Sequence, residues 1–404
     1  MKLLQVNASY KPAYVYGGPT MSVSKLSEEL SKAGCETEVF TTTANGAAEL
    51  PVTPGESARI DGVKVTYFKR LTKDHTHYSP ALLKQLRKDV RNFDLVHIHA
   101  WWNLVSVLSC RVALKRGVPV VISPRGTLSA YSFSNKNSLA KRLIHVLLGE
   151  KLLKESYIHV TSEREREAME KLVVSKKIYN IPNFIVFPNK IPGRTSERGD
   201  CLKLIFLSRI EEKKGLEILF EALAGIDIPY RLSIAGDGDP GYISNLKEKS
   251  VKLGITERVD WIGFQNDRKF DILQQHDLFV LPSYDENFGN AVIESLSMGT
   301  AVLISNNVGL AGYVEQYNLG WVCSQDAVCY PRALLILSRS LFTSFNNLFK
   351  SLVNGKAKCI PVEQRPHTFT HLQPIREQDK TRIRTPPKRH FSIKPWKNSI
   401  PVSQ

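Results

Sequence analysis

Short apolar, β-branched runs alternate with longer helical patterns along the first two-thirds of the chain. The strand-like runs of the first half are KLLQVNA (2–8), ETEVFTTT (36–43), DLVHIHA (94–100), VPVVISP (118–124) and YIHVTS (157–162). Helical patterns such as 20–34 and 79–90 lie between them. Continuous apolar strands separated by helices predict a parallel sheet that helices cover on both faces.

A second series of strand-like runs follows the polar, proline-bearing stretch 187–200. Its members are CLKLIFLSRI (201–210), YRLSIAGDG (230–238), VDWIGF (259–264), DLFVLPS (277–283), TAVLISN (300–306) and GWVCSQ (320–325). We therefore predict two doubly wound, Rossmann-like α/β domains, 1–186 and 201–326, joined by a linker at 187–200. Ligands of such sheets bind beyond the carboxyl ends of the strands, so the loops after the strands are the place to look for a site.

The pattern stops near Asp326. Segment 331–353 has apolar residues at spacings of three and four, which predicts an amphipathic helix with Leu334, Leu337, Leu341, Phe345, Leu348 and Leu352 on one face. Residues 327–404 hold 14 Lys and Arg, 3 Asp and Glu, and 8 of the 21 prolines. Most of the net charge of +16 therefore belongs to this tail. After the helix it is aperiodic, and we expect it to be partly disordered.

Composition excludes several classes of protein. The first residues, MKLLQVNASYK, contain only a four-residue apolar run, shorter than a signal peptide needs, and no run approaches the length of a membrane span. The six cysteines are scattered without a Cys-x-x-Cys pair, which favours free thiols in the cytoplasm and argues against zinc. No aromatic–basic repeat supports nucleic-acid binding.

Three post-strand loops of the first domain carry candidate site residues. Gly17 and Gly18 allow backbone amides to approach a ligand at a helix N-terminus, although Gly-Gly-Pro also simply turns a chain. His97 and His99 share one side of a strand next to Trp101 and Trp102. A single buried histidine often has only a structural role, but two histidines beside two tryptophans suggest a polar site with an aromatic stacking platform. His99 is the candidate, because it lies nearer the opening of that site. Arg125 could hold a phosphate or an acceptor, or pair with a surface carboxylate.

The second domain offers a set of residues suited to a nucleotide diphosphate. Arg209 ends a strand and Lys214 precedes a helix, so both can meet a diphosphate, although the stretch also resembles a charged turn. Gly236 and Gly238 suit tight backbone turns. The stretch SYDENFGNAVIESL (283–296) leads into a predicted helix at 290–299 through Phe288, Gly289 and Asn290. Glu286 lies before this entry, and Glu294 lies inside the helix. The recurrence of such features after strands in both domains favours one shared site.

These motifs together resemble glycosyltransferase family 4, which has the GT-B fold of two Rossmann-like domains facing across a cleft. The resemblance covers about residues 1–326, and its most specific part is the Glu-x7-Glu motif from Glu286 to Glu294. It implies a retaining, metal-independent hexosyltransferase-like enzyme that needs no cofactor. Its donor would be a nucleotide-diphosphate sugar and its acceptor a glycan or a lipid-linked sugar, as in the synthesis of bacterial surface polysaccharides.

The resemblance also implies a role for each residue. Arg209 and Lys214 would neutralise the diphosphate, which fixed cations and amides must do where no metal is present. Glu294 would bind the ribose, Glu286 the transferred sugar, and Phe288, Gly289 and Asn290 the phosphates through backbone groups. The resemblance places four further contacts: Gly17 and Gly18 would close over the phosphates, and Gly236 would lie in the donor site. His99 would lie near the transferred sugar, and Arg125 on the acceptor side.

The C-terminal part, 327–404, departs from the family. Relatives continue with further helices, the last of which crosses back to the first domain. Either a frameshift replaced the native end, or the segment is a membrane-surface helix with a polybasic extension that binds anionic lipid at the inner face of the membrane. The alternatives to a glycosyltransferase are a GT-B sugar-nucleotide epimerase, an inactive remnant that binds donor only, and a nucleic-acid or lipid-binding protein.

Overall fold

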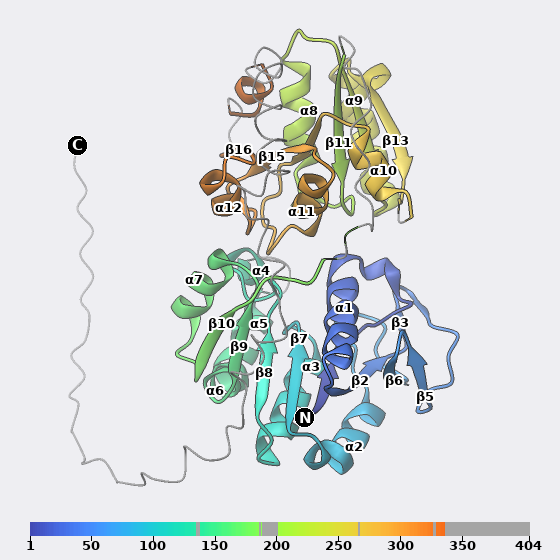
Figure 1. Cartoon of the computed structure of the whole chain (residues 1–404), viewed down its shortest axis with the longest axis vertical. Helices are drawn as coiled ribbons and strands as arrows, with labels where there is room; N and C mark the ends of the chain where they lie inside the picture. The colour runs from blue at the N-terminus through green and yellow to red at the C-terminus, as the bar shows by residue number, and fades with distance from the viewer. Residues whose placement is uncertain (135–137, 186, 188–200, 266, 326–328, 336–404) are drawn as a thin grey trace, which may run out of the picture. The chain divides into compact units, whose positions relative to one another are not determined.

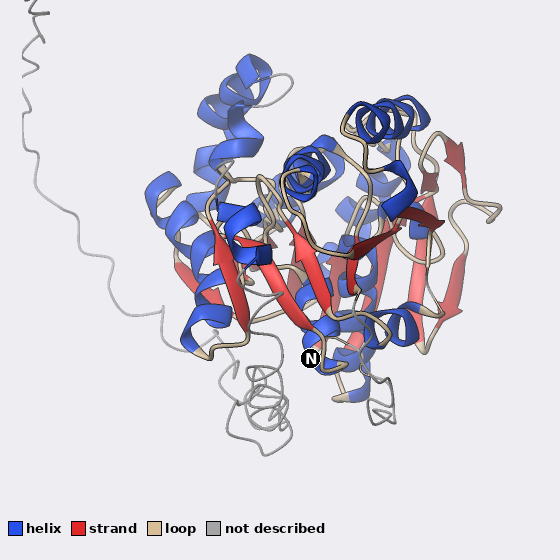
Figure 2. Ribbon diagram, turned by 90° about the horizontal axis from the view of Figure 1, so that it is seen from above, coloured by secondary structure: helices blue, strands red, loops and turns tan. Residues whose placement is uncertain are grey.

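The computed structural model describes residues 1–134, 138–185, 187, 201–265, 267–325 and 329–335. These residues form two α/β domains, each built on one mainly parallel sheet (Figure 1). Helices lie on both sides of the strands, as expected for doubly wound sheets (Figure 2).

The N-terminal sheet has eight strands in the order β10-β9-β8-β7-β1-β2-β6-β5. All neighbours are parallel except β5 and β6. Its strands are β1 (Lys2–Val6), β2 (Glu36–Thr42), β5 (Ser57–Ile60), β6 (Val63–Phe68), β7 (Leu95–His99), β8 (Val120–Ser123), β9 (Tyr157–Val160) and β10 (Lys177–Asn180). A separate two-stranded ribbon pairs β3 (Ala44–Asn45) with β4 (Ala48–Glu49).

Helices of this domain follow the strands and bury apolar side chains against the sheet. They are α1 (Gly18–Lys32), α2 (Pro80–Asp89), α3 (Leu104–Lys115), α4 (Ala130–Ser134), α5 (Ser138–Ile144), α6 (Glu150–Lys154) and α7 (Glu163–Leu172), with a π-helical turn at His145–Gly149. One core cluster includes Leu4, Ile98, Val120 and Ile158, from the central strands.

The C-terminal sheet has six parallel strands in the order β13-β12-β11-β14-β15-β16. They are β11 (Leu202–Leu207), β12 (Tyr230–Ala235), β13 (Val259–Gly263), β14 (Leu278–Leu281), β15 (Ala301–Ser305) and β16 (Gly320–Cys323). The described helices between them are α8 (Leu216–Ala224), α9 (Pro240–Lys252), α10 (Lys269–Gln274), α11 (Asn290–Ser297) and α12 (Ala311–Gln316). The strand order reverses between β11 and β14, and in the first domain between β1 and β7. These switch points are where doubly wound sheets bind ligands.

Every strand-like run identified in the sequence contains a strand of the structure, which confirms the two-sheet interpretation. In the N-terminal sheet the sequence pattern did not identify β5, β6 or β10, and it also missed the ribbon strands β3 and β4. Two of these, β5 and β10, lie at the edges of the sheet and bury little, so they lack the continuous apolar character of the inner strands.

Little of the C-terminal segment falls within the described residues. Residues 329–335 are helical, and Leu334 is fully buried in the core of the second domain, as the amphipathic pattern predicts for that position. The rest of the predicted helix and the basic tail lie outside the described residues, and so does most of the linker at 187–200. The domain boundaries therefore stay predictions.

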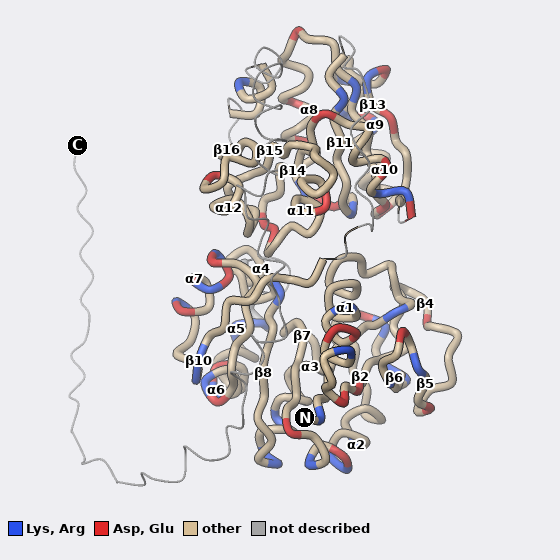
Figure 3. The backbone as a smooth tube through the Cα atoms, in the orientation of Figure 1, with Lys and Arg blue, Asp and Glu red and all other residues tan. Residues whose placement is uncertain are grey.

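Basic and acidic residues are interspersed over both α/β domains (Figure 3). In the described part of the chain, no helix has both the length and the apolar character needed to cross a bilayer. The cysteines of that part form no disulfide bond with one another; they are Cys35, Cys110, Cys201, Cys323 and Cys329.

Candidate active site

Lys214 and Glu286 form an ion pair at the switch point of the C-terminal sheet. Lys214 ends a short 3-10 turn after β11 and is buried, while Glu286 follows β14. Burial by itself would raise the pKa of Glu286, but the positive charges of Lys214, Lys213 and Arg209 outweigh it and hold the pKa below its ordinary value. Glu286 is therefore a carboxylate at neutral pH.

Helix α11 begins beside this pair and leaves its N-terminus open. Gly289 has φ +95°, a conformation that side chains disfavour, and precedes the first helical residue, Asn290. Phe288 buries its ring in the core, so this stretch can offer only backbone groups to a ligand from that position. No side chain caps the helix, and its first N–H groups and positive dipole end are available to an anion.

Open N-termini are a shared property of three helices near the predicted site. Side chains cap the helices α2, α3, α7 and α9, through Ser79, Asn103, Ser162 and Asp239 respectively. By contrast, the helices α6, α10 and α12 have no side-chain cap. Among the uncapped helices, α1, α8 and α11 begin at glycines with positive φ, at Gly17, Gly215 and Gly289. These three are the helices for which the sequence predicts contact with the donor.

Glu294 lies on α11 and accepts a hydrogen bond from Lys269 of α10, with 2.7 Å between Nζ and Oε1. The carboxylate is mostly buried, and its second oxygen accepts no hydrogen bond from a described residue. Lys269 thus fixes one side of the carboxylate and leaves the other side able to accept hydrogen bonds from hydroxyl groups.

Two glycines position the loop that carries Arg209. A Cβ atom at Gly236 would lie 1.9 Å from the Ser208 carbonyl oxygen, and one at Gly238 would lie 2.0 Å from that of Ile210. Only glycine permits this close approach of the two loops. Arg209, held between them, is 49% exposed and pairs with Glu211 at 3.1 Å.

The predicted glycine loop of the first domain lies beside these residues. A Cβ atom at Gly17, where φ is +64°, would lie 3.5 Å from Cδ of Arg209. One at Gly18 would lie 3.7 Å from Nδ2 of Asn290. The structure thus brings Gly17 next to Arg209 and Gly18 next to Asn290, although about 190 and about 270 positions separate these pairs in the sequence.

His97 and His99 share one side of β7, as the alternation of side chains predicts, and their rings lie 4.2 Å apart. His99 is fully buried, and both of its ring nitrogens have protein partners. Nε2 lies 2.5 Å from the Gln5 amide oxygen, and Nδ1 accepts a hydrogen bond of 3.1 Å from Nε of Arg125. Burial, with the charges of His97 and Arg125, keeps the pKa of His99 well below its ordinary value, so the ring is neutral. In this conformation His99 supports Arg125, and its predicted contact with the transferred sugar stays a prediction.

Arg125 connects the histidines to α11. Its Nη1 donates to Asn183 Oδ1 at 3.0 Å and to Ser22 Oγ at 3.1 Å. Asn183 Nδ2 then donates to Asn290 Oδ1 at 3.1 Å. A continuous hydrogen-bonded path therefore runs from His99 to the first residue of α11.

The loop 285–287 is held by side chains around the start of α7. Asp285 accepts a hydrogen bond of 3.0 Å from Ser129 and lies 3.4 Å from Arg164 and 3.0 Å from Lys213. The side-chain amide of Asn287 donates to Thr161 and Glu165, and the backbone carbonyl of Asn287 accepts a hydrogen bond from the Ser162 hydroxyl. These contacts fix the residues on either side of Glu286.

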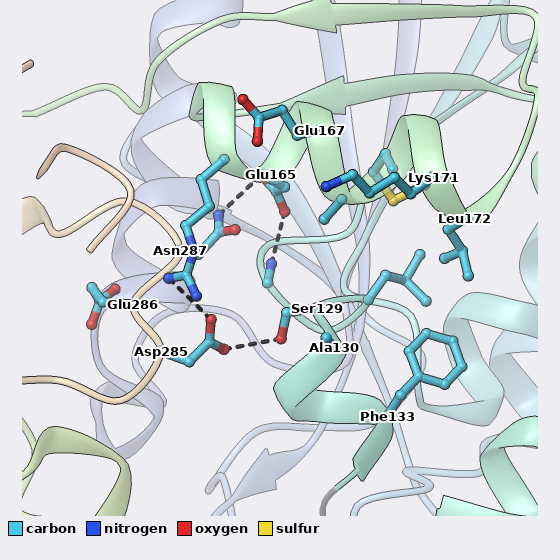
Figure 4. A pocket seen from close by; sticks show the side chains of 15 residues that line it. Ser129, Ala130, Phe133, Glu165, Glu167, Lys171, Leu172, Asp285, Glu286 and Asn287 are labelled. Atoms are coloured by element: carbon cyan, nitrogen blue, oxygen red, sulfur yellow. Dashed lines mark hydrogen bonds and ion pairs between the residues drawn. The ribbon is translucent and has the colours of Figure 1, made fainter. Parts of the chain in front are cut away.

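A cavity of about 410 Å³ adjoins this loop (Figure 4). Figure 4 shows Asp285 pointing toward Ser129 and Asn287 toward Glu165, with Phe133 and Leu172 on the side away from Glu286. Side chains of both charges, such as Arg164, Lys171 and Glu167, line the cavity together with apolar groups, a mixed surface suited to a polar molecule with an apolar part.

Several of these residues escaped the sequence reasoning. Asn183, Lys269, Asp285 and Asn287 have no local pattern that marks them, apart from the adjacency of Asp285 and Asn287 to Glu286. The aromatic platform expected beside His99 is wrong for Trp101, which is fully buried in the core of the first domain. Trp102 packs instead on Phe133, with 5.0 Å between ring centroids.

Among the described residues, no group of three or more His, Cys, Asp and Glu side chains has an arrangement that could hold a metal ion. The expectation of a metal-independent enzyme stays a prediction.

Comparison with known proteins identifies both halves of the chain. Residues 16–186 match the family model described as Glycosyltransferase Family 4, and residues 189–328 match the one described as Glycosyl transferases group 1. An uncharacterized glycosyltransferase of Methanocaldococcus jannaschii is 27% identical over 353 residues, which is 80% of this chain and 85% of the relative. A D-inositol 3-phosphate glycosyltransferase of Rhodococcus erythropolis is 24% identical over 339 residues, 75% of this chain and 74% of the relative.

Solved structures show the same fold. The Anabaena protein HepE in complex with UDP-glucose superposes with a TM-score of 0.69 at 18% identity, covering 92% of this chain and 100% of that one. Sucrose-phosphate synthase from Thermosynechococcus elongatus gives 0.66 at 19% identity, covering 92% and 99%. Over residues 16–328 the chain therefore belongs to glycosyltransferase family 4, and it has the GT-B fold.

Proposed function

We propose that the protein transfers a sugar from a nucleotide-diphosphate donor to a glycan or lipid-linked acceptor, with retention of the anomeric configuration and without a metal. The observation that carries the proposal is the ion pair of Lys214 and Glu286 at the open N-terminus of α11, with Arg209 and the Gly17–Gly18 loop next to it. A cation, free helix amides and an ionised carboxylate from two neighbouring loops suit a diphosphate joined to a sugar.

Each residue has a role in this proposal. The diphosphate lies against Arg209, Lys214 and the backbone of residues 288–290, which stabilise the negative charge of the leaving nucleotide. The ammonium of Lys214 has three N–H donors, so one can stay with Glu286 while others reach a phosphate. Glu294 accepts hydrogen bonds from ribose hydroxyls through its free oxygen.

At the sugar, Glu286 accepts hydrogen bonds from hydroxyl groups and favours the positive charge that develops as the bond to the diphosphate breaks. The acceptor approaches from the same face as the leaving group, so neither glutamate has to act as a nucleophile. His99 contributes through Arg125, because its ring nitrogens are both engaged in the structure.

The names of the relatives indicate which donor and which class of acceptor to test first. The HepE structures contain UDP or UDP-glucose, which makes a uridine nucleotide the first donor to test. Another relative, from Rhizobium meliloti, is named a lipopolysaccharide core biosynthesis glycosyltransferase. A role in surface polysaccharide synthesis at the cytoplasmic face of the membrane is the corresponding proposal for this chain.

An anionic membrane surface is a further partner in this proposal. Leu143, Val146 and Leu147 expose large apolar side chains on consecutive helical turns, and Arg142 is exposed next to them. Apolar side chains flanked by cations favour contact with a lipid surface. Cosedimentation with phosphatidylglycerol vesicles, compared with a variant carrying glutamate at all three apolar positions, tests this part.

Binding of nucleotide diphosphates tests the central proposal. Calorimetric titration of UDP, GDP and ADP should identify one preferred nucleotide, whose affinity falls at least about tenfold in Arg209→Ala and Glu294→Ala. Arg231→Ala is a matched control, because Arg231 forms an exposed pair with Asp260 on a different part of the same domain. Unchanged affinity in both site variants would contradict the assignment.

Separate measurements distinguish the other functions. An epimerase would convert a sugar nucleotide without an acceptor, so product analysis in its absence excludes or supports that activity. An inactive remnant would bind the nucleotide sugar but would not cleave it, so no free nucleotide would form in the presence of membrane extracts. Removal of residues 327–404 tests the tail: DNA binding that persists in the truncated chain would favour a nucleic-acid function.

A further inference from the structure

Arg125 is anchored on three sides by neutral groups. Its Nε donates to His99 of β7, and its Nη1 donates both to Ser22 of α1 and to Asn183 of the loop after β10. These acceptors, a neutral imidazole, a hydroxyl and an amide, fix the plane of the guanidinium without supplying a negative charge. Within the described residues, its second terminal nitrogen, Nη2, donates no hydrogen bond.

The guanidinium also lacks a paired carboxylate. No carboxylate oxygen of a described residue lies within 4.0 Å of it. Glu165, the acid whose charge acts on it, already accepts hydrogen bonds from Gly126, Thr161 and Asn287. The buried guanidinium of Arg70, by contrast, pairs with Glu49 at 2.7 Å. Arg125 is partly buried, and a cation partly removed from water without a counter-charge is costly; a bound anion would remove that cost.

The backbone of Arg125 is strained as well. Its φ is +53°, in the left-handed region that non-glycine residues rarely adopt. It lies directly after β8, at the carboxyl edge of the sheet where ligands of this fold bind. Residues held in such conformations collect at functional sites. Burial lowers the pKa of Arg125 to about 10, which leaves the group charged at neutral pH.

We propose that Arg125 binds a phosphate or carboxylate group of the acceptor, so that the acceptor of this enzyme is an anionic sugar or sugar phosphate. The inference rests on the proposed function and names its substrate class. The donor diphosphate already has Arg209 and Lys214 in the second domain, whereas Arg125 belongs to the first. Asn183 bridges Arg125 to Asn290, which places the acceptor's anion beside the start of α11.

Inorganic phosphate is a suitable probe, because it carries the recognised chemistry without a particular sugar. Titration of phosphate into the full chain saturated with its preferred nucleotide diphosphate, followed by ³¹P NMR, should show a second, weaker site. Arg125→Met should weaken phosphate binding at that site at least about tenfold and leave nucleotide affinity unchanged. Asn183→Ala should weaken it less, since the arginine keeps two of its anchors. Arg231→Met should bind as the wild type does.

Three outcomes would overturn the inference. The first is that phosphate does not bind the nucleotide-saturated protein, and the second is that it binds Arg125→Met as it binds the wild type. A tenfold loss of nucleotide affinity in Arg125→Met would instead assign the arginine to the donor diphosphate. Arg125→Lys, which keeps the charge, should retain part of the phosphate affinity if the variant with methionine proves unstable. Failure of the proposed function is distinct, because the wild type would then bind no nucleotide diphosphate at all.

Discussion

Lys214 and Glu286 are 72 positions apart in the chain, yet their side chains form an ion pair at the point where the strand order of the C-terminal sheet reverses. The pair keeps a partly buried carboxylate ionised next to the open end of α11. Its two members would otherwise each be a charge removed from water without a partner.

Replacement of Glu286 by Gln should reduce sugar transfer about 100-fold and leave nucleotide binding little changed, because in the proposed function the carboxylate contacts the sugar and not the phosphates. Release of the nucleotide from its sugar, measured against a calorimetric titration of the nucleotide alone, separates the two effects. An equal loss in both measurements would place Glu286 on the diphosphate instead.

The same replacement should change how stability depends on pH. The folded state holds the pKa of Glu286 below its ordinary value of 4.5, so its contribution to stability is complete above that pH and is lost as the pH falls through the folded-state value. Urea denaturation should therefore show a larger difference between the wild type and Glu286→Gln at pH 7 than at pH 3.5. A constant difference would mean that the charge does not contribute.

Gly236→Ala should destabilise the second domain and weaken nucleotide binding. The new methyl group would collide with the Ser208 carbonyl, 1.9 Å away, and displace the loop that carries Arg209. We expect a loss of about 1–3 kcal/mol of unfolding free energy. Gly312→Ala is the control, since a Cβ atom there meets nothing within 4 Å and the position is in α12. It should be neutral or slightly stabilising.

Removal of Asp285 should destabilise the protein by breaking contacts around the loop 285–287. Asp285→Ala leaves Lys213 and Arg164 without their shared carboxylate and Ser129 without its acceptor. Both cations are partly exposed, so the expected loss is about 1–3 kcal/mol, less than for a fully buried pair. Denaturant unfolding measures it, and a variant as stable as the wild type would show that water replaces the carboxylate.

The buried histidines predict a loss of stability in mild acid. Burial and the charge of Arg125 lower the pKa of His159 to about 4, against an ordinary value of 6.5. The unfolded chain therefore binds a proton that the folded chain does not, and stability falls as the pH drops from about 6.5 toward 4. His159→Asn should reduce the slope of unfolding free energy against pH in this window, even though it also loses hydrogen bonds at every pH. An unchanged slope would mean that the folded protein can protonate the ring.

The sequence by itself determined the local parts of this protein. Buried β-branched runs fixed the inner strands of both sheets, because a strand covered on both faces needs apolar residues at every position. Gly17 and Gly289 marked helices that begin without a side-chain cap. The spacing from Glu286 to Glu294 is likewise local, since both residues lie in one stretch of strand, turn and helix.

Only the tertiary structure decided which loops meet. The pairing of Lys214 with Glu286 follows from the adjacency of β11 and β14, and the path from Arg125 through Asn183 to Asn290 joins residues from both domains. Strand order depends on burial and packing summed over the whole chain, and a local pattern of residues does not contain it. The same reason explains Trp101, which follows the candidate site residue His99 by two positions in the sequence but packs in the core.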